Sequence, residues 1–336
     1  MNDLLKKLLI LRMPGIGAAK YNSLLSQYGC DAEILEFLHP SNDFIDSVKQ
    51  EIDYAQEMNI EYICDTDSIY PRNLLNIKNH PIVITARGNV ETLSKKSVAI
   101  VGTRHSTAAG MNFVSELAQG FAQHNYAVVS GMAMGTDAAA HFGALKSNGQ
   151  SNTIAVLAGG VDYIWPLENE SLYYEILECG VVISEMPVGF KPNGQNFVQR
   201  NRWVAGISDF LIISEADMKS GSMTTARFAL DYEKRVFAVP GHPSDARSSG
   251  PNYLIKNQDA MLCMGLNDFF DDVNSHSVRK NCKPKNDILD KLGMIPVSES
   301  VLANLVKKSI SEIKADLVIL ELQGLIRKQD GGYVLN

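Results

Sequence analysis

Six apolar runs recur at nearly regular spacing through the middle of the chain. They begin at Val98, Tyr126, Thr153, Val181, Phe210 and Val236, so successive starts are 28, 27, 28, 29 and 26 residues apart. Each interval has room for one helix, which is the layout of a parallel doubly wound sheet covered on both faces. The spacing therefore predicts an α/β fold with a Rossmann-like core over residues 76–273. Residues 81–85 are expected to add one strand at its start.

The segments on either side of this core read as smaller modules. Residues 1–75 read as helical, and PGIG at residues 14–17 is a helix-hairpin-helix signature. Such a turn presents backbone N–H groups to a phosphate, but it also serves as a plain turn, which is the interpretation we favour. Residues 274–286 are polar, basic and without periodicity, which is typical of a linker.

The last segment, residues 287–336, has the pattern of a winged helix. Three helices are expected at 287–293, 298–306 and 309–325, followed by two short strands about the Asp-Gly-Gly turn at 330–332. The presumed recognition helix carries Glu312, Asp316 and Glu321 against Lys314 alone, a net charge of −2. Because phosphates repel that charge, we expect protein contact or packing there in place of base reading.

Composition narrows the class of protein. With 336 residues, 45% hydrophobic and 21% charged, the chain is long enough for two or three globular domains. No apolar run approaches the roughly 18 residues that span a bilayer, and the N-terminus lacks a small-residue cleavage site, so we expect a cytoplasmic protein without membrane contact. The five cysteines are odd in number and form no CxxC pair, so neither a disulfide framework nor a metal site is expected. The net charge of −7 disfavours a protein that coats nucleic acid, so any nucleic-acid site must be local.

The loop from Ser130 to His141 carries the clearest site signal. It follows an apolar strand and opens a helix, and Gly131 and Gly135 permit cramped or left-handed backbone close to a ligand. In open α/β sheets this edge binds anions, and a phosphate is the expected ligand. The alternative is that the glycines only make a tight turn, and this loop alone does not decide between the two.

Three further segments fall at the same edge of the predicted sheet. Gly102 to Ser106 is not GxGxxG, and it offers Arg104 as a permanently charged fork for phosphate. Lys219 to Thr225 opens a helix, and Ser222, Thr224 and the first backbone amides form a second anion cradle. Phe190 to Trp203 interleaves cations with aromatic rings, which suits single strands, since cations follow the backbone while rings stack on unpaired bases.

Signals for catalysis are weaker. The chain has no GxxxxGK[ST], HExxH or GxSxG motif. Asp137 and His141 lie one turn apart and would suit a catalytic pair, but a capping Asp and a packed His are the preferred interpretation. His242 is read as a loop residue without a visible partner.

Several of these segments together resemble the DNA-processing protein A (DprA/Smf) family of bacteria, over nearly the full chain. The resemblance rests on VAIVGTR at 98–104, SGMAMGTDAAAHFGAL at 130–145, FVQRNRWVAGISDFLIISEA at 197–216 and SGSMTTARFAL at 220–230. It implies an extended Rossmann-like core between a small helical SAM-like domain and a winged-helix domain. It also implies single-stranded DNA binding in a basic pocket, a homodimer formed through the Rossmann domain, and no catalysis.

In function, the resemblance implies a recombination mediator that protects incoming DNA and loads the RecA recombinase during natural transformation. No cofactor is implied. Carried over residue by residue, the DNA-binding pocket comprises Gly102, Arg104, Ser130, Gly131, Gly135, Lys191, Phe197, Arg200, Asn201, Arg202, Lys219, Gly221, Ser222 and Arg235.

The chain departs from the family pattern at a few positions. Thr103 stands where the family usually has Ser, Thr136 where it has Ile, and Val198 where it has Pro. The loop before Phe197 has Lys191 where relatives often have more basic groups. These changes predict weaker DNA affinity with the site retained.

Two other functions are considered beside this one. A Rossmann-like nucleotide-processing enzyme similar to the phosphoribohydrolases would use the same edge, but their PGGxGTxxE motif is missing and LAGGVDYIWP at 157–166 contains no Glu. Alternatively, the core is an inert scaffold and the terminal helical modules carry all binding.

Overall fold

The computed structural model describes residues 2–147, 152–269, 288, 291–292, 296–306, 308–322, 326–329 and 331–335. The chain forms two compact units, Met1–Phe269 and Phe270–Asn336, and each has its own apolar core. The predicted linker at 274–286 lies outside the described residues.

A single nine-stranded sheet organises the larger unit, in the order β1-β2-β6-β5-β4-β3-β7-β8-β9. Its strands are β1 (Ile60–Cys64), β2 (Val83–Gly88), β3 (Ser97–Val101), β4 (Ala127–Ser130), β5 (Thr153–Val156), β6 (Val181–Ser184), β7 (Phe210–Ile213), β8 (Arg235–Ala238) and β9 (Met261–Leu262). From β6 to β9 along this order all neighbours run parallel, whereas β2 runs antiparallel to both β1 and β6. The predicted doubly wound parallel sheet is confirmed, and the strand expected at 81–85 is β2.

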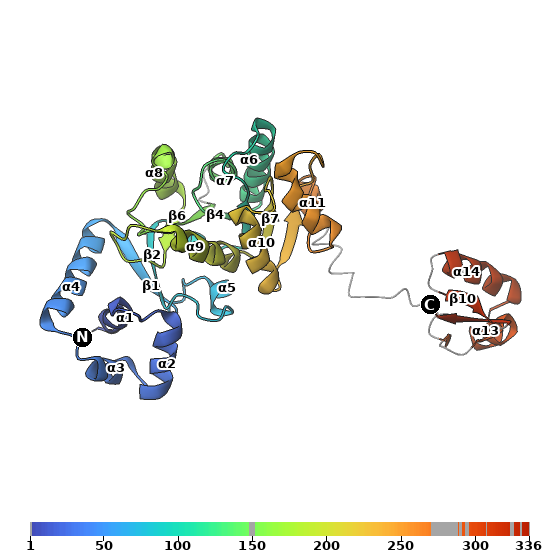
Figure 1. The fold of residues 1–336 in the computed structure, drawn as a ribbon, viewed down its shortest axis with the longest axis horizontal. Helices are drawn as coiled ribbons and strands as arrows, with labels where there is room; N and C mark the ends of the chain where they lie inside the picture. Colours follow the sequence, from blue (N-terminus) through green and yellow to red (C-terminus); the bar gives the residue numbers. More distant parts are fainter. Residues whose placement is uncertain are drawn as a thin grey trace. The chain divides into compact units, whose positions relative to one another are not determined.

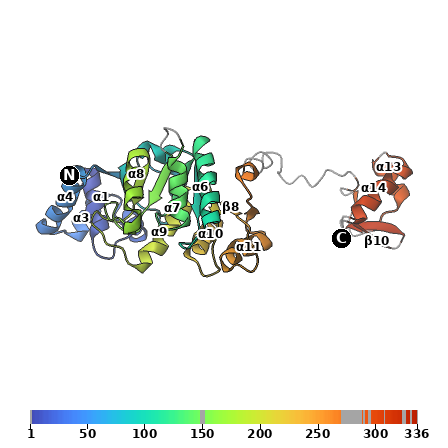
Figure 2. The same ribbon diagram turned by 90° about the horizontal axis from the view of Figure 1, so that it is seen from above.

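Helices cover both faces of this sheet (Figure 1). One face carries α6 (Ala108–Gln123), α7 (Thr136–Leu145) and α8 (Glu170–Cys179), which lie side by side when seen from above (Figure 2). The other face carries α5 (Arg72–Leu75), α9 (Gly194–Ile207), α10 (Gly221–Asp231) and α11 (Ser249–Lys256). Three short 3-10 segments connect them: η1 (Val90–Ser94), η2 (Leu167–Asn169) and η3 (Ala246–Ser248).

Burial on both faces explains why the strands read as continuous apolar runs. In β5, Ile154 and Val156 belong to the apolar cluster that includes residues of α9, while Ala155, between them, belongs to the cluster with Leu172 and Ile176 of α8. Neighbouring residues of a strand point to opposite faces, so a strand with two covered faces has no polar alternation.

Four helices form the N-terminal part of the larger unit: α1 (Asp3–Arg12), α2 (Ala18–Tyr28), α3 (Asp31–Leu38) and α4 (Asn42–Glu57). They enclose their own apolar cluster, which includes Leu8, Leu9 and Tyr21. The PGIG segment is the tight turn between α1 and α2, where Gly15 has φ 78° and Ile16 N donates to Met13 O at 3.1 Å.

The expectation that residues 1–75 are helical is wrong at β1. Asn59, at φ 53°, stops the chain from continuing α4, and the following IEYIC carries the β-branched and aromatic side chains that strands favour. This segment pairs with β2 and belongs to the sheet. The helical part therefore ends at Glu57, and the predicted boundary at residue 75 falls after a strand of the sheet.

The smaller unit contains α13 (Glu299–Val306), α14 (Ile310–Leu322), β10 (Ile326–Gln329) and β11 (Gly332–Leu335). The two strands pair as an antiparallel wing, and Val297 forms a bridge to Tyr333. The acidic groups of α14 bond locally, because Asp316 accepts from Lys308 at 2.8 Å and Glu312 from Ser309 Oγ at 2.7 Å. Most of the helix expected at 287–293 lies outside the described residues.

Within the described part of the chain, no helix is both long and apolar enough to cross a membrane. The described cysteines Cys30, Cys64, Cys179 and Cys263 are free thiols, and Cys64 and Cys263 are buried.

Close contact between α6 and α7 gives a first prediction. A Cβ on Gly143 of α7 would overlap the backbone of Ser115 in α6. We expect Gly143→Ala to lower the free energy of unfolding by about 1–3 kcal/mol through overpacking, measured by urea denaturation. Gly194→Ala is the matched control, because nothing lies within 4 Å of its Cβ position. Equal stability of the two variants would contradict the packing described here.

Candidate nucleic-acid interface

A cleft opens where the winding of the sheet reverses. The chain passes from β3 outward through β4, β5 and β6, then returns to place β7 on the other side of β3. The loops after β3 and β7 therefore diverge, and the cavity between them has a volume of about 290 Å³. We call it the switch-point cleft. It is lined by residues 101–105, Gly131, Ala133, Asp137, Arg200, Asn201, Val204, Asp217, Ser220, Gly221, Ser222 and Thr225.

Half of the predicted site residues meet in this cleft. Gly102, Arg104, Gly131, Arg200, Asn201, Gly221 and Ser222 all line it. They come from the ends of β3 and β4, from α9 and from the start of α10. These segments lie up to 120 residues apart in the sequence. The fold brings them together because the carboxyl ends of parallel strands meet at one edge of the sheet.

The start of α10 gives the cleft its positive wall. Ser220 is the N-cap, and its side chain accepts from Ser222 N at 3.2 Å. Ser222 Oγ donates to Gly102 O at 2.5 Å, so the loops after β3 and β7 are joined by a direct hydrogen bond. An eleven-residue helix starting here points its amino end, with its partial positive charge, at the cleft.

Arg200 lies at the back of the cleft and bonds to the protein. Its Nη1 donates to Gly131 O and to Val156 O, and its side chain is buried. A Cβ on Gly131 would overlap the guanidinium, so this glycine is required by Arg200 and not by a ligand. Arg200 is thus an organising residue of the loop after β4.

Asp137 complements Arg200 from α7. Burial raises the pKa of the Asp137 carboxyl, while the charge of Arg200 opposes that rise. The carboxylate accepts from Gly131 N at 3.2 Å and Ala133 N at 3.3 Å, and the N-cap of α7 is Gly135. Asp137 therefore holds the preceding loop. The expectation that it caps the helix is wrong, because the N-cap position is taken by Gly135.

Ser130 and Gly135 lie behind the cleft without lining it. Ser130 is buried and donates to Ile100 O at 2.7 Å. Gly135 has φ 74°, and a Cβ there would meet Thr103 O at 2.5 Å, so the close approach is to the loop after β3. Two departures from the family pattern meet at the same place, because Thr136 Oγ1 donates to Thr103 O at 3.2 Å.

Arg104 extends over two aromatic rings beside the cleft. Its Cζ lies 5.1 Å from the ring centre of Trp165 and 6.0 Å from that of Phe197, and the two ring centres are 4.6 Å apart. The arginine is exposed and both rings are half-buried. Cation–π attraction holds the guanidinium near the mouth of the cleft, and no carboxylate among the described residues forms an ion pair with it.

Sequence reasoning missed Trp165. The segment LAGGVDYIWP was tested only as an enzyme motif, although it follows β5 and so ends at the same edge as the other site loops. This position was the available signal. The loop after β5 is also tied to the loop after β6, because Gly160 N donates to Phe190 O at 2.9 Å.

Besides Ser130, Gly135 and Phe197, four further predicted residues do not line the cleft. Arg235 is the first residue of β8, so it lies at the opposite, amino edge of the sheet, over the ring of Phe210. Arg202 points from α9 toward Tyr232 Oη and Lys78 O, at 3.2 Å each. Lys191 and Lys219 are exposed on loops at the carboxyl edge. Arg235 therefore lies away from the cleft, because a strand's first and last residues face opposite edges of the sheet.

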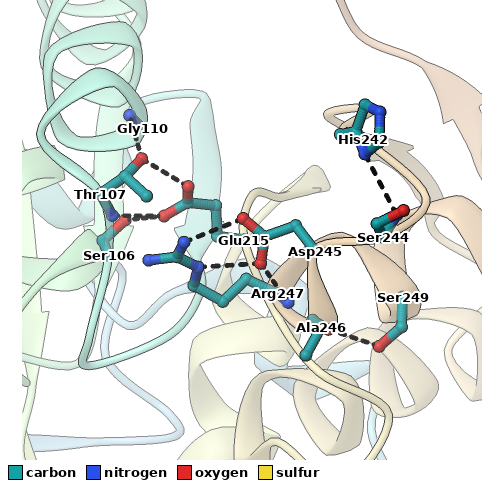
Figure 3. Close-up of polar contacts among 10 residues, drawn as sticks. All are labelled: Ser106, Thr107, Gly110, Glu215, His242, Ser244, Asp245, Ala246, Arg247 and Ser249. Carbon is teal, nitrogen blue, oxygen red and sulfur yellow. Dashed lines mark hydrogen bonds and ion pairs between the residues drawn. The ribbon is translucent and has the colours of Figure 1, made fainter.

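Glu215, in the loop after β7, is bonded to the residues that precede α6 (Figure 3). Its carboxylate accepts from Thr107 N at 2.7 Å and from the hydroxyls of Ser106 and Thr107 at 2.6 Å each. Burial acts to raise the pKa of Glu215, but these hydrogen bonds outweigh it and hold the pKa below its usual value. The start of α6 is thereby fixed to the loop after β7. His242 accepts from Ser244 N in its own loop, as Figure 3 also shows.

His141 is packed in the interior, as the preferred interpretation of the sequence expected. His141 is fully buried, and its Nδ1 lies 2.7 Å from Thr153 Oγ1, which itself donates to Val128 O. Nδ1 therefore donates to Thr153. Burial, with a smaller effect of Arg200, lowers the pKa of His141 to about 3, so the ring is neutral and packed.

The geometry agrees with comparison to known proteins. The sequence profile of the DNA recombination-mediator protein A family matches residues 61–274, and that of the DprA winged helix domain matches residues 283–332. The chain is 36% identical to the protein Smf of Synechocystis over 62% of its own length, and 30% identical to the protein Smf of Escherichia coli over 86%. It spans about half (53%) of the Synechocystis relative and 80% of the E. coli one.

The chain belongs to the DNA recombination-mediator protein A family. Solved DprA structures agree with this assignment. The protein from Streptococcus pneumoniae superposes with a TM-score of 0.69 at 30% identity, over 80% of this chain and 98% of that one. The DprA of Helicobacter pylori, described for its single-stranded DNA binding mode, gives 0.58 at 31% identity, over 64% and 97%.

Protonation of His141 gives a second prediction. The folded pKa of about 3 lies below the ordinary 6.5, so the unfolded chain binds a proton that the folded chain excludes as the pH falls below 6.5. The stability held by the neutral ring is therefore lost from pH 6.5 toward pH 3. We expect the native protein to lose about 2 kcal/mol more than His141→Asn between pH 7 and pH 5 in urea unfolding.

His39→Asn is the control for that comparison. His39 is exposed at φ 47°, a left-handed position that Asn also adopts, so its replacement should leave the pH dependence unchanged. The same pH slope in native protein and His141→Asn would contradict a buried neutral ring.

Proposed function

We propose that this protein is a single-stranded DNA-binding recombination mediator and that the strand binds at the switch-point cleft. The observation that carries the proposal is the meeting of Arg104, the start of α10 and two aromatic rings in one place. A single strand offers a phosphate backbone and unpaired bases, which need a positive groove and exposed rings side by side. Few other ligands require both.

The chemistry divides between the two parts of the site. Arg104 and the backbone N–H groups at the start of α10 suit phosphate oxygens, the arginine as a planar fork and the helix through its partial charge. Trp165 and Phe197 suit the faces of bases, which all four bases present. Neither part reads base edges, so the proposed binding tolerates many sequences.

Relatives support this assignment. Family membership supports a role in DNA recombination, and the single-stranded DNA binding described for the H. pylori protein concerns a chain that this one covers almost completely. The finer proposals are protection of incoming DNA, loading of RecA during natural transformation, a homodimer through the Rossmann-like part and a cytoplasmic location. They rest on the family resemblance.

We propose that this protein binds DNA without catalysing a reaction. The phosphoribohydrolase-like alternative would place a Glu at the last position of PGGxGTxxE, and in LAGGVDYIWP that position is Pro166. His141, the other candidate for proton transfer, is fully buried and bonded to Thr153.

Removal of Arg104 is the first test. We expect Arg104→Ala to weaken binding of an oligothymidylate about tenfold, equivalent to 1.4 kcal/mol. The slope of log affinity against log salt should fall by about 0.7, the value for one phosphate contact on a single strand. Arg227→Ala, an exposed position on α10 that does not line the cleft, should leave both unchanged. Unaltered affinity and slope in Arg104→Ala would rule out the proposed site.

Fluorescence tests the aromatic part. The chain has two tryptophans, and Trp203 is only 3% exposed, so Trp203→Phe leaves Trp165 as the single indole. We expect an oligothymidylate to quench that emission, because a base contacts the ring. Trp165→Ala should weaken binding about tenfold, within the 1–3 kcal/mol of one stacked base, while Trp165→Phe keeps most of it.

Leu167→Ala is the control for Trp165, since Leu167 is 71% exposed two residues further along the same loop. If the oligonucleotide leaves the Trp165 emission unchanged, or if Trp165→Ala and Leu167→Ala bind with equal affinity, Trp165 is not part of the binding site.

A further inference from the structure

A second cavity lies at the opposite edge of the same sheet. It has a volume of about 290 Å³, equal to that of the switch-point cleft, and is lined by residues 70–73 and 93–96 with Ser68, Ile207 and Asp209. These residues surround the amino ends of β3 and β7, which begin at Ser97 and Phe210. We call it the amino-edge cavity.

The two cavities are separate sites. β3 has five residues, and at a rise of about 3.3 Å per residue the two edges are about 16 Å apart. The sheet and its covering helices lie between them. A ligand in one cavity therefore does not contact residues of the other.

Cationic side chains predominate in the amino-edge cavity. Arg72, Lys95 and Lys96 line it against a single carboxylate, Asp209, which leaves an excess of two positive charges. The Asp209 carboxylate is already bonded to the protein, because Oδ2 accepts from Ser97 N at 2.8 Å and Oδ1 from Asn73 Nδ2 at 3.0 Å. It builds the wall of the cavity, and the cations set its charge.

The remaining walls are rigid and partly apolar. Tyr70 is buried, and its hydroxyl donates to Pro81 O at 2.6 Å, which fixes the ring. Leu93 and Ile207 are also buried and belong to the main core of the sheet. The cavity is thus preformed, with polar groups over an apolar floor, as small-molecule sites usually are.

The net charge of the amino-edge cavity limits the class of ligand that it can bind. A metal cation is repelled by the excess positive charge, and a purely apolar molecule offers no acceptor to the charged groups that line the cavity. A phosphate monoester carries −1.5 to −2 at pH 7, which matches the excess of two. An internal phosphodiester carries only −1 and continues as a chain in both directions.

We propose that the amino-edge cavity binds a phosphate monoester, carried by a mononucleotide or by the 5′ end of a DNA strand. Arg72 and Lys96, both exposed, contact the phosphate oxygens, and Lys95 contributes charge from the wall. The apolar floor takes the attached nucleoside. This site is independent of the switch-point cleft and does not rest on the function proposed for it.

The test uses the full chain with Arg104→Ala as background, so that phosphate binding in the switch-point cleft is weakened. Thermal unfolding is followed against inorganic phosphate at constant ionic strength, and a bound ligand raises Tm. We expect a rise in this background. With Arg72→Gln and Lys96→Gln added, the Kd for phosphate should increase about tenfold or more, the effect of 1.4 kcal/mol.

Lys49→Gln in the same background is the matched control, because Lys49 is an exposed lysine on α4 that pairs with Asp46. Arg72 and Lys96 are exposed, so their replacement leaves the core intact, and Tm without phosphate verifies this. A full phosphate-dependent rise in the Arg72→Gln, Lys96→Gln protein would overturn the proposal.

Two further ligands distinguish the source of the phosphate. Stabilisation by thymidine 5′-monophosphate assigns the cavity to free nucleotides. Tighter binding of a 5′-phosphorylated than of a 5′-hydroxyl oligothymidylate assigns it to strand ends. In either case the effect should be lost in the Arg72→Gln, Lys96→Gln protein. If neither stabilisation by the mononucleotide nor tighter binding of the 5′-phosphorylated strand is seen, the proposal is overturned. Loss of oligonucleotide binding in Arg104→Ala alone concerns the switch-point cleft and leaves this result unaffected.

Discussion

The buried charge of Arg200 is the constraint on which the architecture of the site depends. From α9 it bonds to carbonyl oxygens at the ends of β4 and β5, and Asp137 supplies the opposite charge from the far face of the sheet. A buried charge without compensation is costly, so removing either partner should disturb both loops at once. Gly131 must lack a side chain to admit the guanidinium. Arg200 on α9 thus links the ends of β4 and β5 to Asp137 on α7.

Around this centre the site is assembled from small groups that fix loops to one another. Ser222 joins the loops after β3 and β7, and Glu215 holds the start of α6 with three hydrogen bonds. The protein satisfies these groups internally, and the exposed groups, Arg104 with its two rings and the start of α10, remain for a ligand. The pre-organised scaffold lowers the ordering cost of binding, which favours affinity without many contacts.

The sequence predicted the sheet well because strand spacing and two-sided burial are local properties. It failed where pairing is long-range: β1 was read as helix because its partner β2 lies beyond it in the chain, and β2's antiparallel direction has no signature in its residues. In the site, glycines were assigned to a ligand although Arg200 and the Thr103 backbone occupy the space beside Gly131 and Gly135. Trp165 was missed because its nearness to Arg104 arises only in the folded chain.

A strand bound across the switch-point cleft would contact the rings of Trp165 and Phe197. This contact can be tested by photo-crosslinking a 5-bromodeoxyuridine-substituted single strand to the full chain and mapping the modified peptides. We expect the modified peptides to contain Trp165 and Phe197. Crosslinks confined to the winged-helix unit or to the four N-terminal helices would contradict it.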